Sequence, residues 1–257
     1  MLRYTAIAAA ILAAAYVVVC ALLYLGQRDL LYFPQGTRVT AAQTDFTLRR
    51  GADVQLRGWQ VHPGRDKVLL YFGGNAEDLR SARAQLQAAL PDHSVYLLAY
   101  RGYGASDGTP SETALVGDAV ALYDHVRAMQ PQAQIAVLGR SLGSGVASQL
   151  AARRAVSRLA LVTPFDSLVS AAQAHYPWAP VRWLLRDRYD SARALRVYRG
   201  PLLILRAGRD QVVPPSSTDA LLEALPQHPT MVAFAQADHN DISDDPAYME
   251  ALQAFLR

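Results

Sequence analysis

The 257-residue chain is poor in cysteine and in lysine. Its single cysteine, Cys20, excludes an intramolecular disulfide, so cysteine usage does not indicate a redox compartment. Lys67 is the only lysine among 25 basic residues, which indicates a coding bias typical of bacteria. The formal net charge is only +3 and no basic run is interleaved with aromatic residues, so nucleic acid is not an expected partner. The chain has no internal repeat and no low-complexity tract.

Alternating strand-like and helix-like runs fill the chain beyond its first 27 residues. About 230 residues remain there, enough for one domain with a substantial core. The alternation predicts an α/β fold with a mostly parallel central sheet and helices on both faces. The predicted helices span 79–89, 112–129, 146–154, 216–224 and 247–256.

A Gly-x-Ser-x-Gly motif at 139–143 lies between an apolar strand-like run and a helix-like run. At such a junction the motif predicts a nucleophile elbow, a sharp turn that strains the central residue. The flanking glycines are needed because side chains there would collide with neighbouring backbone. Ser141 is therefore the candidate nucleophile.

An acid and a histidine follow the serine, each just past a predicted strand. Asp210 ends the loop after an apolar run at 202–205, and His239 follows the run at 231–234. Serine, acid and histidine in this chain order are typical of a catalytic triad on an open parallel sheet. The histidine would take the serine proton, and the carboxylate would orient the histidine ring. Asp166, one strand earlier, is the alternative acid.

Two backbone N–H groups are candidates for an oxyanion hole. One belongs to Leu142, directly after the nucleophile, and the other to Asn75, in the loop after the predicted third strand. Gly74, before Asn75, would let the backbone approach a substrate closely. The Gly-Gly-Asn sequence is also that of an ordinary tight turn.

Four segments together resemble the alpha/beta-hydrolase superfamily, in its membrane-anchored alpha/beta-hydrolase-domain branch. They are Tyr-Phe-Gly-Gly-Asn-Ala at 71–76, Tyr-Arg-Gly-Tyr-Gly at 100–104, the motif at 139–143, and Gly-Arg-Asp at 208–210 with the later His-Asn-Asp at 239–241. The resemblance covers roughly residues 30–257 and implies an alpha/beta-hydrolase fold with a short helical lid. Most relatives have His where Gly73 stands, which leaves the support of the oxyanion loop open.

An apolar run, Ala6–Leu25, precedes the domain, and no charged residue occurs between Tyr4 and Gln27. Twenty helical residues span the roughly 30 Å hydrocarbon layer. We therefore expect residues 1–27 to form a single transmembrane anchor and residues 28–257 the hydrolase domain. A cleaved signal peptide is the alternative, although its apolar stretch is shorter and ends in a small-residue cleavage site. Arg3 favours an extracytoplasmic catalytic domain, but Arg28 on the other flank nearly balances it.

The segment at about 164–200 is longer than a simple crossover and is the expected lid. In one interpretation, Trp178, Trp183 and Leu184 line an acyl pocket there and nearby arginines face anionic lipid heads. The alternative is a helical cap that packs on the sheet and carries a solvated basic face.

These features predict a serine hydrolase that cleaves ester or thioester bonds through an acyl-enzyme. The expected substrate is a small or lipid-like acyl compound, and no cofactor or metal is implied. Two alternatives stay open: a non-catalytic, membrane-tethered module that binds a partner, and a serine peptidase or amidase on the same fold.

Overall fold

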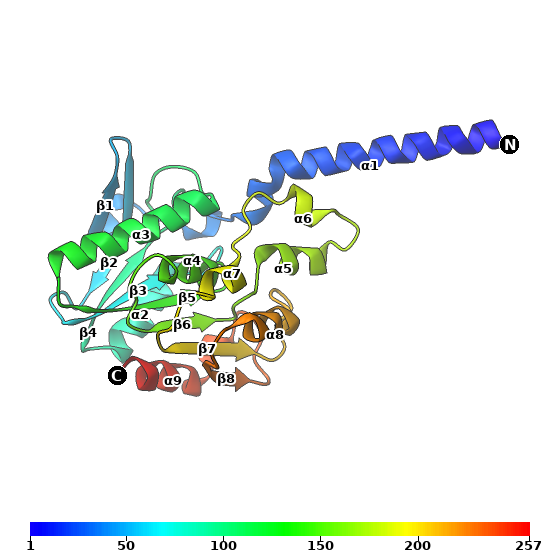
Figure 1. Ribbon diagram of the computed structural model, residues 1–257. Coiled ribbons are helices and arrows are strands. Elements are labelled where there is room, and N and C mark those ends of the chain that lie inside the picture. Colours follow the sequence, from blue (N-terminus) through cyan, green and yellow to red (C-terminus); the bar gives the residue numbers. More distant parts are fainter.

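The computed structural model describes residues 1–257. An eight-stranded sheet forms the centre of the protein (Figure 1). The strand order is β1-β2-β4-β3-β5-β6-β7-β8. The strands from β4 to β8 run parallel to one another, while β2 pairs antiparallel with both β1 and β4. The strands are β1 (Phe46–Arg50), β2 (Val54–Val61), β3 (Lys67–Phe72), β4 (His93–Leu98), β5 (Gln134–Arg140), β6 (Leu159–Val162), β7 (Leu202–Ala207) and β8 (Thr230–Phe234).

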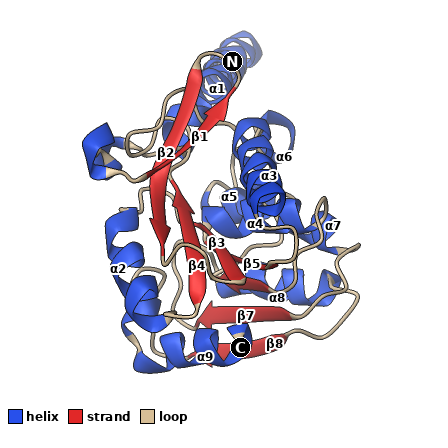
Figure 2. Ribbon diagram, turned by 90° about the vertical axis from the view of Figure 1, so that its left-hand side faces the viewer, coloured by secondary structure: helices blue, strands red, loops and turns tan.

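Helices cover both faces of this sheet, as the alternating pattern predicts. Figure 2 shows α2 and α9 on one side and α3 and α4 on the other. Together with α8, the helices of the two faces have the bounds α2 (Leu79–Ala89), α3 (Glu112–Met129), α4 (Leu142–Ala151), α8 (Pro215–Ala224) and α9 (Pro246–Leu256). Two of them have the predicted bounds. The largest difference is α4, which begins four residues before the predicted start, because the glycine-rich turn after Ser141 is already helical.

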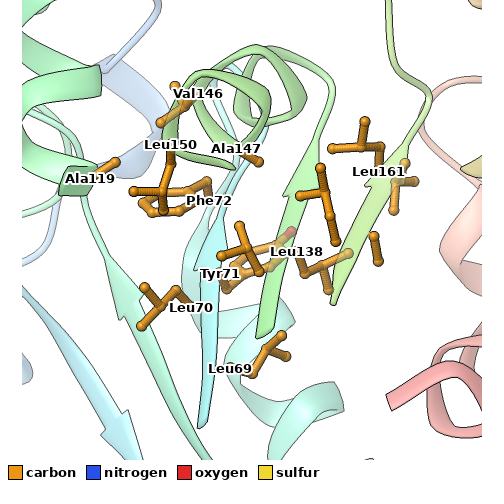
Figure 3. Packing of buried hydrophobic residues seen from close by; sticks show 14 of the residues in the cluster. Leu69, Leu70, Tyr71, Phe72, Ala119, Leu138, Val146, Ala147, Leu150 and Leu161 are labelled. Atoms are coloured by element: carbon orange, nitrogen blue, oxygen red, sulfur yellow. The ribbon is translucent and has the colours of Figure 1, made fainter. Parts of the chain in front are cut away.

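The helix α4 packs directly on the two central strands. Ala147 and Leu150 lie on the side of α4 that faces Phe72 on β3 and Leu138 on β5 (Figure 3), and these four side chains and that of Val146 are buried. Complete burial of a large apolar side chain contributes about 1.5–3 kcal/mol. The turn between β5 and α4 is therefore held by some of the best-packed residues of the core.

The helix α1 (Leu2–Leu31) extends away from the domain, with the N-terminus at its far end (Figure 1). It is long and apolar enough to cross a membrane, and its most apolar window has no residue buried against protein. The helix continues four residues past the expected boundary at residue 27. Its last turn packs on the domain, where Gln27 is buried and Tyr32, just after the helix, is only 3% exposed.

Three short helices lie between β6 and β7, in the segment expected to form the lid. They are α5 (Leu168–His175), α6 (Val181–Leu184) and α7 (Ser191–Leu195). The helix α7 packs on α4, whereas α5 and α6 contact each other, and α6 also contacts α1. We call the segment from α5 to α6 the cap.

Candidate active site

Ser141 occupies the turn between β5 and α4 in a strained backbone conformation. Its φ is +51° and its ψ is −117°, in a region that L-residues rarely adopt. A Cβ on Gly139 would lie 2.3 Å from the carbonyl oxygen of Gly143, and a Cβ on Gly143 would lie 2.0 Å from that of Phe72. Only glycine fits at either position, so the motif has the tight turn that its spacing predicts.

Hydrogen bonds connect Ser141, His239 and Asp210 in one chain. The Ser141 Oγ lies 2.8 Å from Nε2 of His239, and the opposite ring nitrogen, Nδ1, lies 2.7 Å from Oδ2 of Asp210. Because an ionised carboxylate only accepts hydrogen bonds, Nδ1 carries the ring proton and Nε2 accepts from the serine hydroxyl. All three residues are buried, at 5–7% exposure. The second carboxylate oxygen of Asp210 accepts from the backbone N–H groups of Val212 and Val213 at 2.9 and 2.7 Å.

The other carboxylates near the motif serve local structure. Asp166, the alternative acid, accepts hydrogen bonds from the hydroxyls of Ser167 and Ser170 at the start of α5. Asp238 accepts from the backbone N–H groups of Asn240 and Asp241, and these two hydrogen bonds lower its pKa. None of these carboxylates bonds to the His239 ring, so Asp210 alone among the candidates orients it.

The two N–H groups expected to bind an oxyanion lie beside Ser141. Leu142 begins α4, where the first N–H groups of a helix have no partner within the helix. The backbone N–H of Asn75 also donates no hydrogen bond within the protein. Asn75, Ser141 and Leu142 line one cavity, and a Cβ on Gly74 would lie 3.6 Å from that of Ser141. Both donors are therefore available next to the serine hydroxyl.

Glu77 supports the loop that carries Asn75. One oxygen of its carboxylate accepts the N–H of Gly74 at 2.5 Å, and the other accepts the hydroxyl of Tyr71 at 2.6 Å. A Cβ on Gly73 would lie 2.7 Å from the side chain of Leu79 and 3.2 Å from Glu77. A side chain at 73 would therefore require Leu79 and Glu77 to shift, and in this chain the Glu77 carboxylate supports the loop. Since Gly74 gives its N–H to Glu77, that group is not free for a substrate.

Asn75 itself is held by its side chain from two directions. Its amide donates to the carbonyl of Leu31 at 2.6 Å, and its carbonyl accepts from the Tyr103 hydroxyl at 2.6 Å and from the N–H of Phe33 at 3.1 Å. The hydroxyl of Tyr100 donates to the carbonyl of Gly73 at 2.8 Å. The Arg-Gly-Tyr-Gly loop and the end of α1 thus both position the oxyanion loop.

Arg140, the variable residue before the serine, supports the opposite side of the site. Its guanidinium donates to the carbonyls of His239 and Asn240 at 3.2 and 3.0 Å. Burial is the largest single influence on the pKa of Arg140 and lowers it, but the charge of Glu77 and the interactions with Tyr71 and Tyr248 together outweigh burial, and the pKa is raised. Arg140 and Glu77 line a second cavity of about 360 Å³ with Tyr71 and Tyr248. Burial raises the pKa of both tyrosines, so they remain neutral donors.

An apolar cavity of about 450 Å³ opens over Ser141, and 16 of its 20 lining residues are hydrophobic. Its floor includes Ser141 and Val213, and the cap contributes Leu184 as expected. The sequence prediction for Trp178 and Trp183 is wrong, because neither lines the cavity and their exposures are 53% and 83%. The two tryptophans lie outside the cavity, and the cap lines it with His175, Tyr176 and smaller aliphatic side chains.

The end of α1 forms the remaining wall, a position that the sequence did not predict. Leu23, Leu30 and Leu31 line the cavity. The only signal in the sequence is the group of polar residues from Gln27 to Asp29, directly after the apolar run.

A set of polar contacts holds this end of α1 against the last residue of the cap and the segment that follows it. Gln27 donates to the carbonyl of Leu184 at 3.1 Å and accepts from the N–H of Arg186 at 2.7 Å. Arg28 forms a salt bridge with Asp187 at 3.1 Å, and the Tyr32 hydroxyl donates to the same carboxylate at 3.1 Å. We call these contacts of Gln27, Arg28 and Tyr32 the latch.

Comparison with known proteins agrees with this architecture. The model of the family described as serine aminopeptidase, S33, matches residues 63–187. An uncharacterized protein of Mycobacterium tuberculosis is 35% identical over 245 residues, which cover 90% of this chain and 87% of the relative. The lysophosphatidylserine lipase ABHD12 of Xenopus tropicalis is 31% identical over 57% of this chain and 44% of its own length. Among solved structures, the esterase Pf2001 of Pyrococcus furiosus has a TM-score of 0.67 at 16% identity and covers 82% of this chain and 88% of its own.

The strand order, the strained serine turn and these matches define the class of protein. The chain belongs to the alpha/beta-hydrolase superfamily and is a hydrolase of that fold.

Proposed function

We propose that the protein is a membrane-anchored serine esterase that acts on lipid-like acyl esters. The observation that carries the proposal is the buried chain of hydrogen bonds from Ser141 through His239 to Asp210 at the base of an apolar cavity. A cavity of about 450 Å³ is in the range of small-ligand sites.

The proposed reaction follows from the roles of these groups. The Oγ of Ser141 attacks the ester carbonyl carbon while its proton passes to Nε2 of His239. The carbonyl oxygen becomes an oxyanion, which accepts hydrogen bonds from the N–H groups of Asn75 and Leu142. The leaving alcohol takes the proton from His239. Water then attacks the acyl-enzyme by the same route and releases the acid.

An amidase or peptidase is the alternative that the matched family description favours. An aminopeptidase needs a negative group in its cavity to bind the substrate ammonium. The polar lining residues here are Gln27, Asn75, Ser141 and His175, and no carboxylate is among them. The lining therefore supports an uncharged acyl substrate, with a thioester as a further option because its carbonyl uses the same oxyanion donors.

We also propose that residues 1–27 anchor the protein in a membrane, with the catalytic domain on the extracytoplasmic side. The exposed apolar length of α1 supports the anchor, because water contact costs about 25 cal/mol for each Å² of apolar surface. The protein should pellet with membranes and resist carbonate extraction. Protease treatment of sealed membranes would test the side, and a mature N-terminus near Gly26 would show a cleaved signal instead.

An alkyl fluorophosphonate tests the catalytic proposal directly. In the proposed enzyme the Ser141 Oγ–phosphorus bond forms, fluoride leaves, and the serine proton passes to His239. We expect one label per chain, found on Ser141 by peptide mass spectrometry. A folded wild-type protein that takes no label and hydrolyses no p-nitrophenyl ester would be a binding module instead of an enzyme.

A further inference from the structure

The end of α1 is at once part of the apolar run and part of the cavity wall. Leu23 lies within the run Ala6–Leu25, and it also lines the cavity over Ser141 with Leu30 and Leu31. Leu23, Gln27, Leu30 and Leu31 are spaced at i, i+4, i+7 and i+8, so they share one face of the helix. The same face therefore belongs to the proposed membrane anchor and to the candidate active site.

The cap follows this face of α1 further toward the N-terminus. The hydroxyl of Tyr16 donates to the backbone carbonyl of Trp178 at 3.0 Å. Tyr16 lies eleven residues before Gln27, which is about 16 Å along the helix axis. The tip of the cap thus contacts α1 well inside the apolar run.

Aromatic side chains at the cap tip are exposed in the same region. Tyr176, Trp178 and Trp183 are 52%, 53% and 83% exposed. Tryptophan and tyrosine are enriched at membrane–water interfaces, where an apolar ring and a polar group are both accommodated. A helix that enters the bilayer at about Leu25 brings these rings to the membrane with it.

The latch closes the space between α1 and the cap at the C-terminal end of the helix. Gln27 bonds to Leu184 and Arg186, and Arg28 to Asp187, so the helix cannot separate from the end of the cap and the segment after it without breaking these contacts. Toward the N-terminus from Leu23, by contrast, α1 and the cap share only the single Tyr16 hydrogen bond. The polar contacts gather at the water side, and the apolar wall continues toward the membrane side.

We propose that a single-chain lipid ester enters the site laterally from the bilayer between α1 and the cap, and that Leu23, Leu30 and Leu31 are its specificity-determining wall. The acyl chain lies along α1 and leaves the hydrocarbon layer without crossing water. This inference rests on the proposed esterase function, and it adds that the anchor itself forms part of the substrate site.

Two fluorophosphonates test this inference on the full-length protein in phosphatidylcholine vesicles, one with a short water-soluble alkyl group and one with a long alkyl chain in the bilayer. Leu23→Trp should lower the ratio of long-chain to short-chain labelling rates by about tenfold or more, since bulk in an apolar pocket discriminates by such factors. Leu22→Trp is the matched control, because Leu22 is 64% exposed on another face of α1. Its ratio should stay at the wild-type value.

Equal ratios in the two variants would overturn the inference and leave the esterase proposal intact. A wild-type protein that takes neither label would overturn both. A long-chain fluorophosphonate with a photoreactive group at its far end avoids the risk that a variant fails to fold. With the wild type we expect cross-links to α1 between residues 20 and 31. Cross-links confined to the loop at Val212 and Val213 would contradict the proposed route.

Discussion

The floor and the outer wall of the apolar cavity are held in different ways. The floor includes the serine, which is connected to the histidine and the acid by hydrogen bonds of 2.7–2.8 Å, and each of the three residues follows a strand of one buried sheet. The outer wall consists of α1 and the cap, which meet through the latch and one tyrosine hydrogen bond. The floor can therefore be rigid enough for chemistry while the wall remains able to admit a bulky substrate.

Removal of the nucleophile should have the largest effect and should affect the floor alone. Ser141→Ala should abolish fluorophosphonate labelling and lower ester turnover by at least about 10⁴-fold, because triad members act as a unit. Folding should be retained, since alanine occupies less space in the same turn. Labelling with mass spectrometry measures the first effect, and thermal unfolding in detergent the second. Stoichiometric labelling of the variant at another serine would show that the nucleophile is misassigned.

The carboxylate that orients His239 should be the next most sensitive position. Asp210→Asn should reduce kcat by about a thousandfold or more, because an amide can leave the His239 ring in the wrong tautomer. Asp166→Asn is the matched control, since that carboxylate bonds only to serine hydroxyls at the start of α5. Steady-state kinetics with a p-nitrophenyl ester compare the two. A larger loss for Asp166→Asn in a folded protein would reverse the assignment.

The support of the oxyanion loop should rank third. Glu77→Ala removes the acceptor for the Gly74 N–H, and the resulting shift of the loop should lower kcat about tenfold to a hundredfold with little change in KM. Glu77→Gln should restore most of the activity, because its amide oxygen still accepts from Gly74 and its amide nitrogen still reaches the Tyr71 hydroxyl. Equal losses in both variants would mean that the charge beside Arg140, and not the hydrogen bond, is what the site requires.

A change in the latch should affect the wall and spare the floor. Asp187→Asn weakens the salt bridge to Arg28, whose side chain is 37% exposed. We therefore expect the free energy of unfolding to fall by about 1–2 kcal/mol, which is less than the cost of breaking a fully buried pair. Turnover of a vesicle-borne lipid ester should fall more than turnover of a short soluble ester. Asp29→Asn, an exposed position on the same turn of α1, is the control. Equal losses on both substrates would show that the latch also supports the floor.

The smallest effect should be a loss of folding stability at low pH, through His93 at the end of the sheet opposite the candidate site. His93 begins β4, and burial lowers its pKa. Above the unfolded value of about 6.5 the histidine is neutral in both states, and below it the unfolded chain binds the proton more readily. The free energy of unfolding should therefore fall as the pH drops below that value. His93→Gln should reduce this dependence of the free energy of unfolding on pH. Denaturant titrations at pH 7 and pH 5 measure this, and an unchanged slope would contradict it.

Local sequence patterns were sufficient to predict most of the fold. The helices at 79–89 and 112–129 have the predicted bounds, because each combines a polar N-cap, Asp78 or Ser111, with a buried apolar face. The fold class is confirmed by the sheet and by the structural matches. The predicted start of α4, at residue 146, lies four residues after the observed start at Leu142. Glycine and serine have low helix propensity, so their sequence does not predict a helix even where the turn makes them helical.

The candidate site was predictable only where chemistry and chain order coincide. Ser141, Asp210 and His239 each follow a strand, and parallel strands gather their carboxyl ends at one edge, so their proximity follows from the fold. Their catalytic roles remain predictions. The outward position of Trp178 and Trp183 was not predictable, because an apolar residue in a cap suits a pocket or a membrane surface equally well.

The sequence by itself determined the alternation of strands and helices, the glycine-flanked serine turn and the apolar N-terminal run, because each depends on residues close together in the chain. Only the tertiary structure decided that Glu77 supports the loop that carries Asn75 and that the helix α1 forms a wall of the cavity. The latch joins Gln27 and Arg28 to residues 157 and 159 positions away, and hydrogen bonds over such separations have no local pattern. They form because the folded sheet brings the end of α1 and the cap together over the same serine.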